Sequence, residues 1–140
     1  MKGKGVRYPA PTLEEERDFI RSHLDPPNST LLVAVNGGEI IGLVGLTGGV
    51  LEEERHVGTF GLSVAEEHRG KGVGTALIEA LVAWAPSAGI SRIQAWVWAN
   101  NPGAIALYQR LGFAQEGVSR NAILSEGQYI DAVLMARLLT

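Results

Sequence analysis

The chain has 140 residues, about the size of one domain, and its 46% hydrophobic and 19% charged residues are typical of an ordered globular protein. It contains no cysteine, which excludes disulfides, thiolate metal ligands and a cysteine nucleophile. The net charge of -3, from 12 basic and 15 acidic side chains, argues against a general nucleic-acid surface, so any anion site is expected to be local. We expect a single domain over 1–140, without signal peptide or membrane span, in the cytoplasm.

The first predicted element is a helix over about 12–24, because the segment from Thr12 to Glu15 has capping-box spacing and apolar residues follow at helical intervals. A strand over 31–35, a tight turn at 36–38 and a partner strand over 39–46 then predict a β-hairpin. No strand is predicted ahead of this hairpin. The sheet is therefore expected to begin at Leu31.

The remainder of the chain alternates strands and helices. After an acidic loop, a strand precedes the glycine-rich segment, and apolar residues then recur at helical spacing. An asparagine followed by proline predicts the start of a second helix, which a glycine ends. The predicted elements are strands over 57–64, 93–98, 113–119 and 128–138, and helices over 73–84 and 101–111. This order predicts an α+β fold, a mixed sheet with helices on its faces.

The glycine-rich segment, EEHRGKGVGTALIEALVAWA over 66–85, places loose backbone and positive charge at the start of a helix. It fits neither the P-loop pattern nor the dinucleotide fingerprint. It does fit R-x-x-G-x-G, with Arg69, Gly72 and Gly74. Backbone N–H groups at a helix N-terminus can wrap a pyrophosphate when no side chains intervene. The alternative is that these glycines only make a tight turn.

A second motif, ANNPGAIALYQRLGF over 99–113, follows the next predicted strand. Together the two motifs resemble the GNAT superfamily of acetyl-CoA-dependent N-acetyltransferases, over roughly 30–139. The segments RHVGTFGLSV and EGVSRNAILSEGQYIDAVLMARLL look like the branch that acetylates amino acids and similar small amines. The resemblance implies a mostly antiparallel GNAT-like sheet flanked by helices. It also implies acetyl-CoA as co-substrate.

The resemblance implies that the cofactor lies against a strand end, the glycine loop and the second helix. Pantetheine would add like a short strand to free backbone at the strand end. Asn101 would contact the cofactor arm, or serve only as a helix cap, or do both. Arg110 would reach a CoA phosphate or remain a solvated cation. The implied cofactor residues are Leu62, Ser63, Val64, Arg69, Gly70, Lys71, Gly72, Val73, Gly74, Thr75, Asn101, Ala104, Tyr108 and Arg110.

The resemblance assigns Tyr108 as the acid that protonates the leaving thiolate; the alternative is a core aromatic. The Leu62 N–H would face the thioester carbonyl, which becomes an oxyanion on attack. The first candidate for the general base is His56, since an unperturbed imidazole titrates near pH 6.5. Glu54 is the second candidate and a water chain the third. His23 and His68 have no partners at metal-ligand spacing, so we expect no metal site.

Many family members begin with a strand and a helix ahead of the segment that matches 12–24, and we expect this chain to have room for neither. The wall of the acceptor pocket would then be absent, supplied by a partner chain, or built differently. We expect a homodimer, because an uncovered edge at Leu31 is a liability that proteins usually cover, and because the apolar tail Ala132–Leu139 could cross to a partner.

The expected activity is transfer of acetyl from acetyl-CoA to a primary amine of a small molecule such as an amino acid. The amine attacks directly, since no cysteine is available for a covalent thiol intermediate. The alternatives are a CoA-binding module without acetyltransferase activity, an acetyltransferase of protein N-terminal amines, and an anion-binding α/β domain unrelated to acyl transfer.

Overall fold

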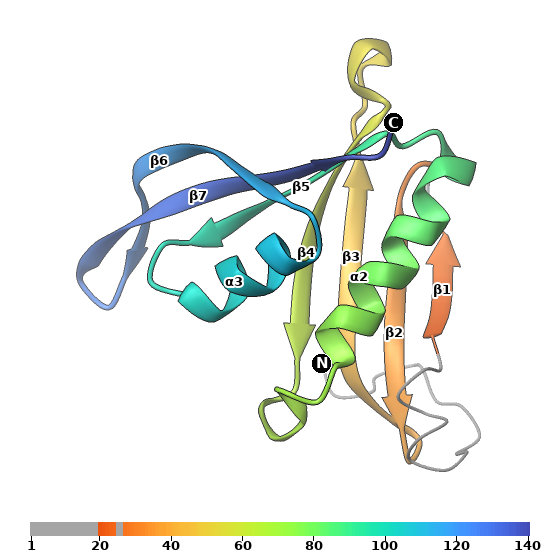
Figure 1. Ribbon diagram of the computed structural model, residues 1–140, viewed down its shortest axis with the longest axis horizontal. Helices are drawn as coiled ribbons and strands as arrows, with labels where there is room; N and C mark the ends of the chain where they lie inside the picture. The colour runs from red at the N-terminus through yellow and green to blue at the C-terminus, as the bar shows by residue number, and fades with distance from the viewer. Residues whose placement is uncertain (1–19, 25–26) are drawn as a thin grey trace.

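The computed structural model describes residues 20–24 and 27–140, which form a seven-stranded sheet with two α-helices (Figure 1). The strand order is β1-β2-β3-β4-β5-β7-β6, and every neighbouring pair is antiparallel except β4 and β5. This confirms the α+β class and the mixed, mostly antiparallel sheet. The elements are β1 Ile20–Leu24, β2 Thr30–Asn36, β3 Glu39–Gly48, β4 Val57–Val64, α2 Val73–Trp84, β5 Arg92–Trp98, α3 Pro102–Arg110, β6 Ala114–Ser125 and β7 Gln128–Leu138.

The N-terminal prediction is wrong where the structure describes it. Residues 12–19 of the predicted helix lie outside the described residues, and residues 20–24 form the strand β1 instead. Ile20 pairs with Ala34 and Leu24 with Thr30, antiparallel to β2. The open edge of β2 offers a row of backbone donors and acceptors, and satisfying them outweighs a weak local helical preference. A strand therefore does precede the hairpin, and the sheet does not begin at Leu31.

The hairpin between β2 and β3 forms as predicted. Gly37 and Gly38 both have positive φ, 62° and 83°, which suits a two-residue turn between twisted strands. On β3, Gly42 allows α2 to pack closely, because a Cβ there would lie 2.9 Å from the Val73 Cγ1 atom. The fully buried side chains of α2, Leu77 among them, therefore reach the sheet directly.

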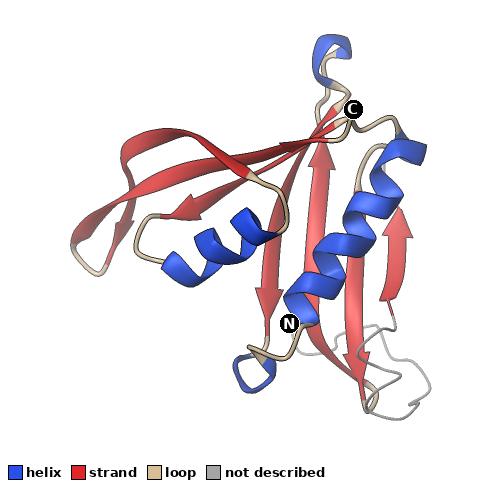
Figure 2. Ribbon diagram, in the orientation of Figure 1, coloured by secondary structure: helices blue, strands red, loops and turns tan. Residues whose placement is uncertain are grey.

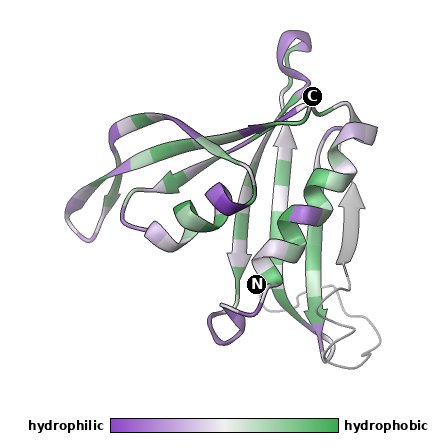
Figure 3. Ribbon diagram, viewed as in Figure 1, coloured by the Kyte–Doolittle hydropathy of each residue, from purple (hydrophilic) through white to green (hydrophobic). Residues whose placement is uncertain are grey.

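The two helices cover the same face of the sheet (Figure 2), and they share one core with the strands beneath them. Hydrophobic residues run along the strands that α2 crosses (Figure 3). Gly74 on α2 allows this helix to pack closely against β4 and α3, since a Cβ there would lie 3.3 Å from the Leu62 side chain and 3.4 Å from that of Leu107.

Of the two C-terminal strands, β7 forms over the predicted residues 128–138, whereas β6 is longer than the predicted 113–119. β6 continues to Ser125, past an irregularity between Ser119 and Ile123. β7 lies between β5 and β6, and its Val133 and Met135 are buried. The expected crossing of Ala132–Leu139 to a partner chain is therefore wrong, because residues 132–138 of this segment are a strand within the sheet of their own chain and Leu139 packs against the core.

Candidate active site

The parallel strands β4 and β5 form a fork. They pair only at Val57, Gly58 and Thr59, and then separate (Figure 1). Gln94 Nε2 donates to Thr59 Oγ1 over 3.1 Å at the closed end of the fork. Beyond it, residues 60–64 of β4 have no ladder to β5. Such a stretch presents backbone groups to which an extended ligand can add as a short strand.

The glycine loop brings the N-terminus of α2 to the open end of the fork. Gly70 and Gly72 have φ values of 74° and 85°, in the left-handed region that favours glycine. Gly72 is the N-cap residue and no side chain caps the helix, so the N–H groups of its first turn lack intrahelical acceptors. Arg69 Nε donates to the Val64 carbonyl oxygen over 3.2 Å, which holds this cation beside the strand end.

A pocket of about 630 Å³ joins the strand end, the glycine loop and α3. It brings together every predicted cofactor residue except Lys71 and Val73, which line an adjoining hollow. None of the described residues that line the pocket is acidic, and two are arginines, so it favours a polyanion. The lining residues are Leu62, Ser63, Val64, His68, Arg69, Gly70, Gly72, Gly74, Thr75, Asn101, Gly103, Ala104, Leu107, Tyr108 and Arg110.

Tyr108 is both a core aromatic and a residue of this pocket. Its side chain is 6% exposed, and its ring lies 5.4 Å from that of Phe60 and 5.7 Å from that of Phe113, measured between centroids. Burial disfavours the phenolate and raises the pKa of Tyr108 to about 12. The phenol is therefore protonated at neutral pH, as a general acid must be.

Asn101 caps α3 as predicted. Its Oδ1 accepts from the Ala104 N–H over 3.1 Å, and Pro102 follows at the first helical position. We expect Asn101→Ala to lower the free energy of unfolding by about 1 kcal/mol. Asn101→Asp keeps the accepting oxygen and should stay near wild type in a urea titration. An equal loss in both variants would contradict the capping role.

The two candidate bases lie apart from the pocket. His56 is exposed just before β4, and its carbonyl oxygen accepts from the N–H groups of Ser91 and Arg92 over 2.9 and 3.2 Å. It precedes Leu62 by six residues, roughly 20 Å along an extended strand. Glu54 lines a separate hollow at the same end of the sheet. The structure therefore brings neither residue together with Tyr108.

The pocket also contains residues that the sequence interpretation missed. His68 is half-buried and lines the pocket, although it was expected on the surface. Gly103 and Leu107 line it as well; both lie within the second motif, which was the available signal. Within the described part of the chain, no group of three or more His, Cys, Asp or Glu residues could hold a metal ion.

Comparisons with known proteins agree with this geometry. The family model described as "Acetyltransferase (GNAT) family" matches residues 4–113. The chain is 31% identical over 114 residues to the L-amino acid N-acetyltransferase AaaT of Escherichia coli (strain K12), covering 81% of this chain and 70% of that protein.

Two solved structures share the fold. The acetyltransferase of the GNAT family from Streptococcus pneumoniae is 32% identical with a TM-score of 0.78, covering 81% of this chain and 69% of that one. The phosphinothricin acetyltransferase from Sinorhizobium meliloti, solved in complex with AcCoA, is 27% identical with a TM-score of 0.75, covering 81% and 62%. With the family match over most of its length and with this fold, the chain belongs to the GNAT family of acetyltransferases.

Proposed function

We propose that the chain transfers an acetyl group from acetyl-CoA to the primary amine of a small molecule. The observation that carries this proposal is the convergence of the β4 fork, the uncapped start of α2 and Tyr108 on one pocket. The Sinorhizobium meliloti neighbour was solved with AcCoA, which supports acetyl-CoA as the co-substrate here.

The cofactor would lie along three elements. Its pyrophosphate would meet the segment Arg69–Thr75, where the first N–H groups of α2 and the Arg69 guanidinium favour negative charge. Arg110 lines the same pocket and would contact a further phosphate. The pantetheine arm would run beside residues 62–64 of β4, which pair with β3 but not with β5. The Leu62 N–H would then donate to the thioester carbonyl oxygen.

The reaction we propose is a direct displacement. The amine nitrogen attacks the thioester carbon and forms the C–N bond, and the C–S bond breaks as the oxyanion collapses. Tyr108 gives its proton to the departing thiolate and recovers one from solvent. Because His56 and Glu54 do not line the pocket, we assign removal of the amine's protons to water. The chain has no cysteine, so no acyl-cysteine intermediate enters the scheme.

Amino acids are the first acceptors to test, since the Escherichia coli relative is named as an L-amino acid N-acetyltransferase. We expect thiol release from acetyl-CoA when a panel of primary amines is supplied, and a mass increase of one acetyl group on the amine. Binding of acetyl-CoA without turnover of any amine, peptide N-termini included, would instead favour a CoA-binding module. Turnover of peptides alone would favour protein N-terminal acetylation.

A homodimer and a cytoplasmic location remain proposals. β1 covers the edge at Leu31, so an open sheet edge no longer supports a dimer. The observation that supports a dimer is the exposure of two large apolar side chains on β5, Trp96 at 50% and Trp98 at 45%. Light scattering at micromolar concentration should give the mass of two chains; the mass of one chain would overturn the dimer. Neither helix in the described part of the chain has the length and apolar character needed to cross a membrane.

A further inference from the structure

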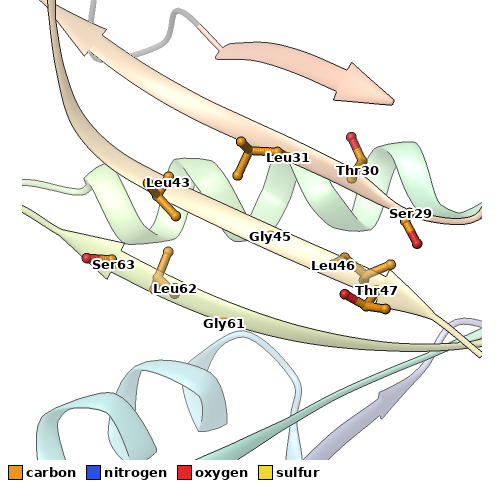
Figure 4. A pocket seen from close by; sticks show the side chains of 10 residues that line it. All are labelled: Ser29, Thr30, Leu31, Leu43, Gly45, Leu46, Thr47, Gly61, Leu62 and Ser63. Atoms are coloured by element: carbon orange, nitrogen blue, oxygen red, sulfur yellow. The ribbon is translucent and has the colours of Figure 1, made fainter. Parts of the chain in front are cut away.

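The face of the sheet away from the helices carries a trough with a floor of bare backbone. Gly45 on β3 pairs directly with Gly61 on β4, so no side chain rises from either position. Leu31 on β2 lies beside Gly45, and the paired residues Leu43 and Ser63 border the floor at one end (Figure 4). The hollow measures about 740 Å³. We call it the glycine trough; its lining residues are Ser29, Thr30, Leu31, Leu43, Gly45, Leu46, Thr47, Gly61, Leu62 and Ser63.

The glycine trough and the cofactor pocket meet at the fork. Leu62 and Ser63 line both hollows, although the hollows open on opposite faces of the sheet. They meet there because β4 has left β5 after Thr59, so the sheet is open beside these two residues. A group placed at Leu62 from the helix side can therefore be reached from the trough. An acyl carbonyl held at the Leu62 N–H is such a group.

None of the described residues that line the trough is charged. Among the described residues that line it, the polar groups are the hydroxyls of serine and threonine, and the rest are leucine and glycine. Arg92 lies on the same face further along β5, but it is engaged elsewhere. Its guanidinium forms an ion pair with Glu116 at 2.7 Å and its Nε donates to Gln94 over 2.9 Å. A carboxylate in the trough would lose water, and none of the described lining residues would supply a cation to compensate for that loss.

We propose that the glycine trough binds the acceptor, and that it selects primary amines whose body is apolar and uncharged over amino acids with a free carboxylate. This inference rests on the proposed acetyl transfer and narrows its substrate class. The apolar body would lie over Gly45 and Gly61 against Leu31 and Leu43. The amine would reach the fork beside Ser63, whose hydroxyl oxygen can accept from an amine N–H.

The first test compares three acceptors that share the 2-phenylethylamine unit: 2-phenylethylamine itself, L-phenylalaninamide and L-phenylalanine. The amide matches the acid in size but carries no charge, so it separates charge from bulk. At equal concentrations of free base, we expect kcat/KM for the amine and the amide to exceed that of the acid at least tenfold. An acid that reacts as fast as the amide overturns the proposal, as does acetyl-CoA binding without turnover of any of the three. Absence of acetyl-CoA binding would instead defeat the proposed function.

The second test fills the trough. A Cβ at Gly61 would meet no atom within 4 Å, so Gly61→Val should fold normally while its side chain occupies the floor. We expect KM for 2-phenylethylamine to rise at least tenfold, with acetyl-CoA affinity by calorimetry within twofold of wild type. Gly117→Val on β6 is the matched control, since a Cβ there also meets nothing within 4 Å, and it should change neither value. An unchanged KM in Gly61→Val overturns the assignment of the trough.

Discussion

Tyr108→Phe is expected to lower kcat by about a hundredfold while acetyl-CoA binding changes little. General acid–base assistance contributes roughly 10²–10⁴-fold, and a thiolate is a good leaving group, which places the effect at the lower end. The phenylalanine ring retains the contacts with Phe60 and Phe113. A role confined to packing would behave differently, since loss of a hydroxyl alters stability by about 1 kcal/mol and leaves the turnover of folded protein alone.

The measurement is kcat at saturating acetyl-CoA, beside a melting curve for each protein. Tyr129→Phe is the matched control, because Tyr129 is 66% exposed on β7 and does not line the pocket. It should retain wild-type kcat. If Tyr108→Phe turns over within twofold of wild type, Tyr108 is not the acid and water becomes the donor.

The raised pKa of Tyr108 also fixes the direction of its pH dependence. With a pKa of about 12 in the folded chain against 10.0 for an unperturbed phenol, the group remains protonated across the neutral range. No loss of kcat on the alkaline side below about pH 11 should therefore come from Tyr108. The folded state is the one that holds the proton more tightly. Its stability is accordingly unaffected by Tyr108 below pH 10 and falls as the pH rises from 10 towards 12.

Gly72→Asp is expected to abolish most of the stabilisation that acetyl-CoA gives to the fold. At about 100 times its dissociation constant, a ligand adds roughly 2.7 kcal/mol to the free energy of unfolding. For a chain of this length that raises Tm by about 10 °C. An aspartate at the uncapped start of α2 would place its own carboxylate where the pyrophosphate is proposed to bind. The increase in Tm on addition of acetyl-CoA should therefore nearly vanish.

Gly72 also has positive φ, so any side chain there strains the backbone. The control is Gly89→Asp, which carries the same change at φ 79°, is exposed, and does not line the cofactor pocket. Each variant is compared with and without acetyl-CoA, so the strain cancels. A ligand shift that survives in Gly72→Asp, or is lost equally in Gly89→Asp, would exclude the pyrophosphate assignment.

The sequence was most informative where a structure depends on local chemistry. The Asn101–Pro102 cap, the Gly37–Gly38 turn and the loop before α2 all follow from backbone preferences within a few residues, and all three form as expected. The two motifs also place their residues in one pocket, because each motif sits where an element begins.

Features that depend on pairing between strands could not be predicted from the sequence. β1 forms because residues 20–24 pair with the edge of β2, and no sequence pattern within 20–24 predicts this pairing. His56 is close to Leu62 in sequence, yet the extended strand β4 separates the two residues and places His56 at the other end of the strand. Gly45 and Gly61 are 16 positions apart, and only the β3–β4 register makes them neighbours in one trough.

The fork has a mechanical consequence for the whole site. One arm, β4, bears Leu62, and the other, β5, leads directly into the helix that bears Tyr108. The arms are joined by three residue pairs and, at the last of them, by the bond between Thr59 and Gln94. A change in the angle between the arms at Thr59 would change the distance between the Leu62 N–H, the proposed oxyanion donor, and the Tyr108 hydroxyl, the proposed acid. Thr59 and Gln94 would thus influence this distance although they line neither the cofactor pocket nor the glycine trough.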